Sequence, residues 1–157
     1  MSSPHEKVER HRAHGAGSSI MQPMHHDDRV AMTRTIIHIL DSWGISDSEQ
    51  LAVLALPAGT PTRAVRRYRK DTPLPEDHRV MERVEHVVGI AEALRTTYPR
   101  NAQMGPRWMQ QPHRRFSNRT PARTVVAEGL GGLIAVRAHL DCAFAWERSE
   151  GMAQSKG

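Results

Sequence analysis

The fold is decided by residues 108–141, which read WMQQPHRRFSNRTPARTVVAEGLGGLIAVRAHLD. Within this stretch a threonine is followed by a proline, Thr120-Pro121, which is typical of a helix start. The threonine hydroxyl can cap the first turn, and proline fits the first helical position. We expect this helix to span Pro121–Glu128. It should end at Gly129, because glycine accepts the left-handed backbone that commonly closes a helix.

A second helix is expected directly afterwards, with one stripe of side chains facing inwards. From about Leu133 these side chains recur at spacings of three and four, which places them on one face of a helix: Leu133, Val136, Arg137, Leu140 and Phe144. Two aromatic residues, Trp108 and Phe116, flank the loop before the first helix. We predict that both are buried anchors beneath this loop. Asn118 can adopt a left-handed backbone in the loop's turn.

These same residues resemble the toxin-binding domain of Xre/MbcA/ParS-type antitoxins. The resemblance rests on five positions at fixed spacing: Trp108, Pro112, Phe116, Pro121 and Gly129. The family usually has an asparagine after the first proline and a glycine two residues beyond the phenylalanine. This chain has His113 and Asn118 at those positions. The resemblance extends more weakly upstream to about Thr33, so it covers roughly three quarters of the chain.

The resemblance implies an all-helical antitoxin that sequesters a RES-domain toxin, an enzyme that consumes NAD. It also implies that the protein binds the operator DNA of its own operon, usually as a homodimer within the toxin–antitoxin complex. The segment from Trp108 to Leu140 would cover the active-site cleft of the toxin and block substrate entry. The toxin-binding residues implied in this way are Trp108, Pro112, His113, Arg114, Arg115, Phe116, Arg119 and Pro121.

The part of the chain before this stretch predicts a helix-turn-helix. From about Arg29 to Gly44, apolar residues recur at helical spacing. Ser46 and Glu49 then have the spacing of a capping box, which indicates the start of a short helix that Pro57 ends. A tight turn containing a glycine would lead from this helix into a third one.

The third helix is the predicted DNA-reading element. We expect it to span Pro61–Lys70 with Thr60 as its N-cap, and this span carries five cations and no acid. The start of a recognition helix usually contacts base edges, while later cations contact phosphates. The residues assigned to bases are Thr62, Arg63 and Arg66, and those assigned to the DNA backbone are Arg67, Arg69 and Lys70. A solvated basic helix without a DNA partner is the alternative.

Composition divides the chain into four segments. The first is rich in histidine and poor in apolar residues, so we predict a disordered tail. Its run His25-His26-Asp27-Asp28 is better explained as solvated tail than as a metal site. A long helix from about Glu76 to Tyr98 should join the two halves of the fold. The segments are residues 1–28 (tail), 29–72 (helix-turn-helix), 73–149 (helical toxin-binding and dimerisation domain) and 150–157 (frayed tail).

Charge favours an anionic partner, because the 157 residues carry a formal net charge of +5. No acidic residue lies between Glu92 and Glu128, and the arginines in this segment are Arg95, Arg100, Arg107, Arg114, Arg115, Arg119 and Arg123. This segment favours an acidic protein surface, with nucleic acid as the alternative. No apolar run is long enough for a membrane span, so we expect no membrane association and a cytoplasmic protein. The single cysteine, Cys142, is expected to be a buried thiol.

The sequence contains no catalytic motif, so we expect a binding protein rather than an enzyme, with no cofactor and no metal site. His78, Glu82 and His86 lie at spacings of four on the long helix, which leaves a small hydrolase as a third hypothesis. Exposed mixed charge on a helix explains these residues better. The main alternative to an antitoxin is a free-standing DNA-binding regulator whose C-terminal half dimerises.

Overall fold

The computed structural model of the protein describes residues 23–154. Within this range the fold is helical and contains no strand, which confirms the predicted all-α class. The elements are α1 (His26–Ser42), α2 (Asp47–Val53), α3 (Ala64–Lys70), α4 (His78–Thr97), α5 (Met104–Met109), the 3-10 helix η1 (Arg114–Phe116), α6 (Pro121–Glu128) and α7 (Leu130–Gln154). Of the described helices, none has the length and apolar character needed to cross a membrane.

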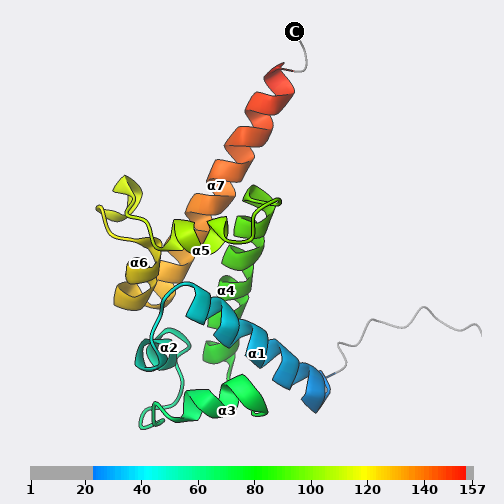
Figure 1. The fold of residues 1–157 in the computed structure, drawn as a ribbon, viewed down its shortest axis with the longest axis vertical. Helices are drawn as coiled ribbons and strands as arrows, with labels where there is room; N and C mark the ends of the chain where they lie inside the picture. The colour runs from blue at the N-terminus through cyan, green and yellow to red at the C-terminus, as the bar shows by residue number, and fades with distance from the viewer. Residues whose placement is uncertain (1–22, 155–157) are drawn as a thin grey trace, which may run out of the picture.

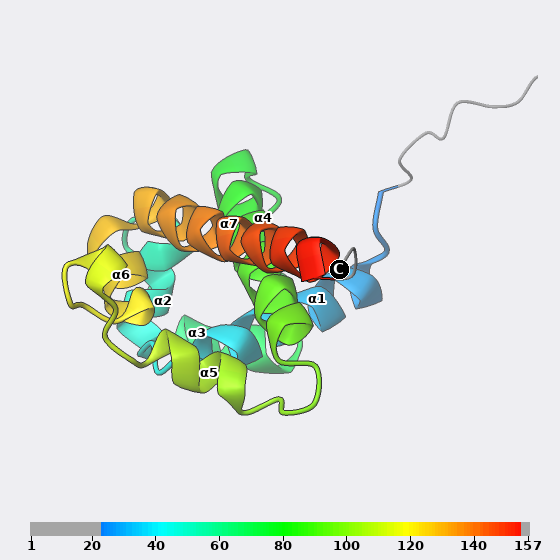
Figure 2. The same ribbon diagram turned by 90° about the horizontal axis from the view of Figure 1, so that it is seen from above.

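The helices pack around the pair formed by α4 and α7, which contact each other along much of α4 (Figure 1). α6 lies against the first part of α7 and also contacts α2. α1 packs on α4 and also contacts α3. Viewed from above, α5 and α7 lie on opposite sides of the molecule (Figure 2). Along the longest axis of the molecule, α3 lies at one end and the C-terminal end of α7 lies at the other (Figure 1).

One continuous core joins the two predicted halves. Its buried side chains come from every element, from Ile36 in α1 to Leu140 in α7. The buried Thr33 hydroxyl is satisfied within it: it donates to the Arg29 carbonyl and accepts from the backbone N–H of Leu74. The hydrogen bond from Leu74 connects the segment before α4 to α1. Breaking it would leave a buried polar group unpaired, which costs free energy.

Local signals predicted the helix ends of the C-terminal half well. α6 spans Pro121–Glu128 as expected, and the Thr120 hydroxyl accepts a hydrogen bond from the Arg123 N–H. Gly129 and Asn118 both have a positive φ, +58° and +62°, as expected, but the ψ of −125° at Gly129 lies outside the left-handed helical region. The capping box of α2 is also present, with both of its reciprocal hydrogen bonds.

The predicted tails were too long. α1 begins at His26, within the segment predicted as disordered, and Asp27 and Asp28 stabilise its first turn by opposing the helix dipole. At the other end, α7 begins at Leu130 and continues to Gln154, so the predicted frayed tail is helical for its first five residues, 150–154. The remaining tail residues, 1–22 and 155–157, lie outside the described part of the chain.

The predicted helix-turn-helix differs from the structure at its turn. α2 ends at Val53, and α3 begins at Ala64 rather than at Pro61. The Thr60 hydroxyl donates to the Pro57 carbonyl and does not cap a helix. Residues 54–63 therefore form a connection longer than the turn of roughly three to four residues in a helix-turn-helix. α3 packs mainly on α1.

Candidate binding surfaces

The loop before α6 is closed by its own backbone hydrogen bonds. The N–H of His113 donates to the carbonyl of Arg119 at 3.1 Å, across the base of the loop. The His113 carbonyl in turn accepts from the N–H groups of Phe116 and Asn118, both at 3.0 Å. Ser117 and Asn118 both have left-handed backbones, which allows this reversal of direction. The loop is therefore a compact unit with a defined backbone.

Four aromatic rings hold this loop to α5 and α7. The Trp108 ring lies 4.7 Å from the His113 ring and stacks on the His139 ring at 6.0 Å, measured between centroids. Phe116 contacts both histidines edge to face, at 6.3 Å from His113 and 5.5 Å from His139. Such pairs add packing energy beyond their buried area. The His113 Nε2 atom also lies 3.3 Å from the Trp108 carbonyl oxygen.

The two predicted anchors differ in burial. Phe116 is 6% exposed, which confirms the expectation for this residue. Trp108 is half-buried and packs against the core, so it is less buried than predicted. Trp108 lies near the end of the short α5, where its indole contacts the rings of His113 and His139.

His139 is the member of this cluster that sequence reasoning missed. The only signal was its place three residues after Val136 on the inward stripe of α7. Burial lowers the pKa of His139, and electrostatic interaction with the nearby Arg115 and His113 lowers it further. His139 therefore contributes a neutral ring to the cluster at neutral pH, since its ordinary pKa is about 6.5.

The residues predicted to bind the toxin divide into supporting and outward-facing groups. Phe116 and Pro121 are buried, and they hold the loop rather than face a partner. Pro112, Arg114 and Arg115 are exposed. Arg119 is half-buried, and its guanidinium forms an ion pair with Glu128 at 2.7 Å.

Four of the seven arginines in the acid-free segment form no ion pair within residues 23–154: Arg100, Arg107, Arg114 and Arg115. Arg123 is different, because its guanidinium binds Glu49 at 2.8 Å and so links α6 to α2. The Arg123 hydrogen bond is also the main reason that the pKa of Glu49 is lowered. Arg95 reaches only Glu92, at 3.9 Å on the solvent side of α4. The arginines left free give this end of the molecule a positive surface.

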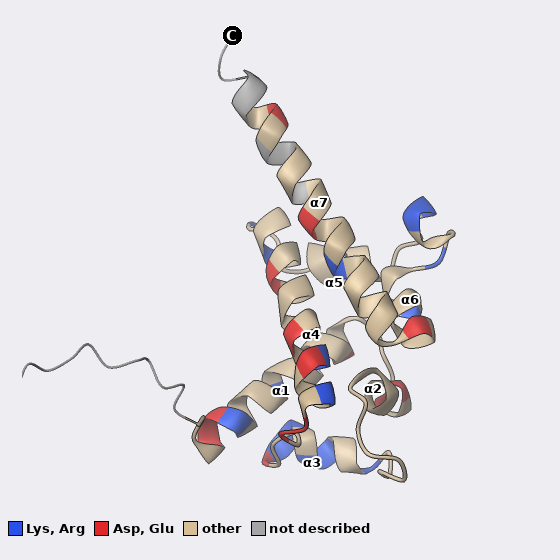
Figure 3. Cartoon of the chain, turned by 180° about the vertical axis from the view of Figure 1, so that it is seen from behind, with Lys and Arg blue, Asp and Glu red and all other residues tan. Residues whose placement is uncertain are grey.

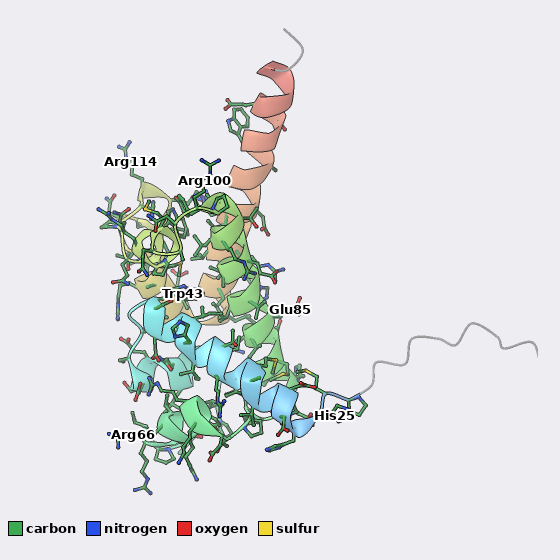
Figure 4. All side chains as sticks on the ribbon, turned by 45° about the vertical axis from the view of Figure 1, so that its right-hand side comes forward. His25, Trp43, Arg66, Glu85, Arg100 and Arg114 are labelled. Carbon is green, nitrogen blue, oxygen red and sulfur yellow. The ribbon has the colours of Figure 1, made fainter. Side chains whose placement is uncertain are left out.

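The basic face of α3 presents most of the predicted DNA-binding residues to solvent. Thr62 and Arg63 lie in the turn before the helix, and the exposed helical cations are Arg66, Arg67 and Lys70. The Arg66 side chain points away from the body of the protein (Figure 4). Basic residues thus gather on α3 at one end of the molecule and on η1 towards the other (Figure 3).

Arg69 has a different role from its neighbours on α3. Its guanidinium binds the carboxylates of Asp41, at 2.7 Å, and Asp47, at 2.5 Å. It therefore joins α3 to the end of α1 and the start of α2, and it is engaged within the chain where a phosphate contact was predicted. The hydrogen bond from Arg69 lowers the pKa of Asp41 against the opposing effect of burial, and a hydrogen bond from Gln50 lowers it further.

The remaining candidate sites lack convergent geometry. His78 and Glu82 are exposed on α4, whereas the Nδ1 atom of His86 lies 3.3 Å from a guanidinium nitrogen of Arg137. No group of three or more histidine, cysteine, aspartate or glutamate side chains that could hold a metal ion occurs among the described residues. Cys142 is exposed on α7, so the predicted burial of its thiol was wrong.

The comparisons with known proteins gave no functional assignment. No model of a known protein family matches the chain, and no curated protein matches it.

Proposed function

We propose that this protein is an antitoxin of the Xre/MbcA/ParS type, which binds and neutralises a RES-domain, NAD-consuming toxin. The observation that carries the proposal is the closed loop of residues 113–119, which presents the adjacent exposed cations Arg114 and Arg115. This loop also carries the sequence positions on which the resemblance to the family rests. A cytoplasmic location belongs to the proposal, because the operator DNA of the operon lies there.

The rigidity of the loop supports a role in binding. Its backbone is fixed by hydrogen bonds at His113, and its aromatic side chains are packed against α5 and α7. Binding a partner would therefore cost the loop little conformational entropy, which favours affinity. The buried Phe116 and Pro121 would act as supports, and Pro112, Arg114 and Arg115 would touch the toxin.

Charge supports an acidic partner surface. Arg114 and Arg115 have no acidic partner in the described structure, and Arg100 projects from the same end of the molecule (Figure 4). Free surface cations accelerate association with an acidic protein and align the two surfaces. In this proposal the cations bind the acidic rim of the toxin's cleft, and the loop with the first half of α7 closes the cleft to the dinucleotide.

The test is co-expression with a RES-domain toxin encoded beside this gene. Wild-type protein should restore growth and co-purify with the toxin, and Arg114→Glu with Arg115→Glu should abolish both effects. Arg79→Glu is the matched control, because Arg79 is an exposed arginine outside the acid-free segment, at the start of α4. Charge reversal is preferable to truncation, since α6 and α7 contribute to the common core. Full rescue by the double variant would refute the assignment of the loop.

A second activity, repression of the protein's own operon, is supported by the exposed cations of α3. Arg63, Arg66, Arg67 and Lys70 form no ion pair within the described structure, so they are available to phosphates and guanine edges. The loop lies far from α3 along the molecule, so operator DNA and toxin could be bound together (Figure 3). The long connection between α2 and α3 implies that α3 would enter DNA at an angle different from that of a helix-turn-helix.

Operator binding is tested by salt-dependent titration on the promoter upstream of the gene. Arg66→Ala should cost about 1–3 kcal/mol and relax specificity at one position, whereas Lys70→Ala should weaken all sequences alike. Arg79→Ala is the control. If operator binding is normal but no toxin co-purifies, the alternative of a free-standing regulator is favoured. If Arg63, Arg66 and Arg67 can all be changed to alanine without loss of affinity, α3 does not read DNA.

A further inference from the structure

The second half of α7 has no partner in the described structure. α7 packs on the body through Leu133, Val136 and Leu140, and then extends well beyond the other helices (Figure 1). Beyond Leu140, every side chain whose exposure is described is exposed, and Trp146 is 68% exposed. An isolated helix of this length is marginal in water, and an exposed tryptophan is typical of a binding hot spot.

A groove of about 1170 Å³ lies on another part of the surface, between α1, α4 and α5. Its apolar lining includes Ile39, Trp43 and Leu94, which also belong to or pack on the core. No aspartate or glutamate lines it, and its arginines, Arg95 and Arg107, are both exposed. The groove therefore suits a ligand that combines an apolar side chain with negative charge.

The end of α7 has this chemistry. Residues 141–154 contain Asp141, Glu147 and Glu150 against a single arginine, and they include Trp146. Acidic residues are visible along the projecting part of α7 in Figure 3. α7 contributes no residue to the groove, and α5, which forms one wall, lies on the opposite side of the molecule (Figure 2). A continuous helix cannot turn back, so the end of α7 cannot reach the groove of its own chain.

We propose that the projecting end of α7 docks in the groove between α1, α4 and α5 of a second copy of this chain, with Trp146 inserted and Glu150, one turn further along the same face of the helix, facing Arg95 and Arg107. Each copy has one such helix end and one such groove. Reciprocal exchange therefore produces a closed two-fold dimer with two identical contacts. This inference does not depend on toxin or operator binding, and it names the surface by which the protein would dimerise.

The first test is the mass in solution of the full chain by light scattering. Wild-type protein should show twice the monomer mass of 17.7 kDa. Trp146→Ser should weaken the dimer about tenfold or more, as expected for the loss of a hot-spot side chain. The pair Arg95→Glu and Arg107→Glu should do the same, and Arg79→Glu should leave the dimer intact. These positions are all exposed, so the variants should fold.

The second test locates the contact by crosslinking. Cys142 is the only cysteine in the chain and is exposed at the start of the projecting segment. With a cysteine introduced by Gln103→Cys on the groove, a short bis-maleimide should join position 103 of one chain to Cys142 of the other. Ser48→Cys, on α2, should give no such product. A monomeric wild-type protein, or crosslinking only between two Cys142 residues, would overturn the proposal.

Discussion

Gly132 is the position where a single methyl group should reveal how tightly α6 and α7 are packed. A Cβ atom on Gly132 would lie 2.4 Å from the Thr124 carbonyl oxygen and 2.9 Å from the Val125 Cα atom. Both neighbours are backbone atoms of buried residues of α6, so neither can rotate away. We expect the clash to cost about 3 kcal/mol, the upper part of the range for overpacking.

The neighbouring glycine provides a matched control. A Cβ atom on Gly131 would meet nothing within 4 Å. Gly131→Ala should therefore stabilise the protein by about 0.5–1 kcal/mol, through helix propensity alone. The same propensity gain applies to Gly132→Ala and offsets part of its clash, which leaves a net loss of about 2 kcal/mol. The two substitutions should thus change stability in opposite directions, although they introduce the same methyl group one residue apart.

Urea unfolding followed by circular dichroism measures this difference. With a slope of about 2 kcal/mol/M, Gly132→Ala should lower the midpoint by about 1 M, and Gly131→Ala should raise it slightly. The slope should stay unchanged in both variants if only the folded state is affected. A Gly132→Ala protein as stable as wild type would show that α6 and α7 leave room for a methyl group at Gly132.

Three further predictions concern side chains whose roles became clear from the structure. Arg69→Gln should cost about 1–2 kcal/mol at neutral pH, because two carboxylates lose their shared partner. Arg69 lowers the pKa of Asp41 in the folded state. The stability from this interaction is therefore present above the unfolded pKa of about 3.9 and is lost as pH falls through the folded pKa. Arg69→Gln should make the free energy of unfolding fall less steeply in this acidic range. His139 also has a lowered pKa, so its contribution to folding stability is complete above about pH 6.5 and declines as pH falls below that value. His139→Phe should therefore reduce the fall in melting temperature between pH 7 and pH 5. Phe116→Ala should cost about 3–5 kcal/mol and Trp108→Ala clearly less, in keeping with their burial; equal losses in denaturant unfolding would contradict the difference in exposure.

Much of the helical framework could be predicted because its signals act within one or two turns of chain. A cap such as Thr120 bonds to an N–H three residues ahead, and proline or glycine restricts the backbone at its own position. The bounds of α6 were therefore predicted residue for residue, and the left-handed Asn118 was expected. Apolar periodicity likewise predicted the inward positions Leu133, Val136 and Leu140 of α7.

Helix α5 and the ends of the third helix were beyond such local signals. α5 contains Gly105 and Pro106, both poor helix formers, and it forms where Gly105 packs closely against Leu94 of α4. Before α3, the dipeptide Thr60-Pro61 has the same two residues as Thr120-Pro121, where the threonine does cap the helix. The Thr60 hydroxyl instead bonds back to Pro57, and the helix starts at Ala64. Identical local patterns thus gave different structures, because the Thr60 hydroxyl bonds to Pro57, whereas the Thr120 hydroxyl bonds to Arg123.

The roles of individual charged and aromatic residues were decided only by the tertiary structure. Sequence alone established an all-helical, basic chain with an acid-free arginine segment and a proline-bounded loop. It could not separate Arg69, which binds Asp41, from Arg66, which faces solvent, because ion pairing depends on residues 28 positions apart in the chain. It also could not place His139 beside Trp108, or leave Cys142 exposed on a projecting helix. Charge and periodicity are properties of the chain, whereas burial and pairing exist only after distant segments meet.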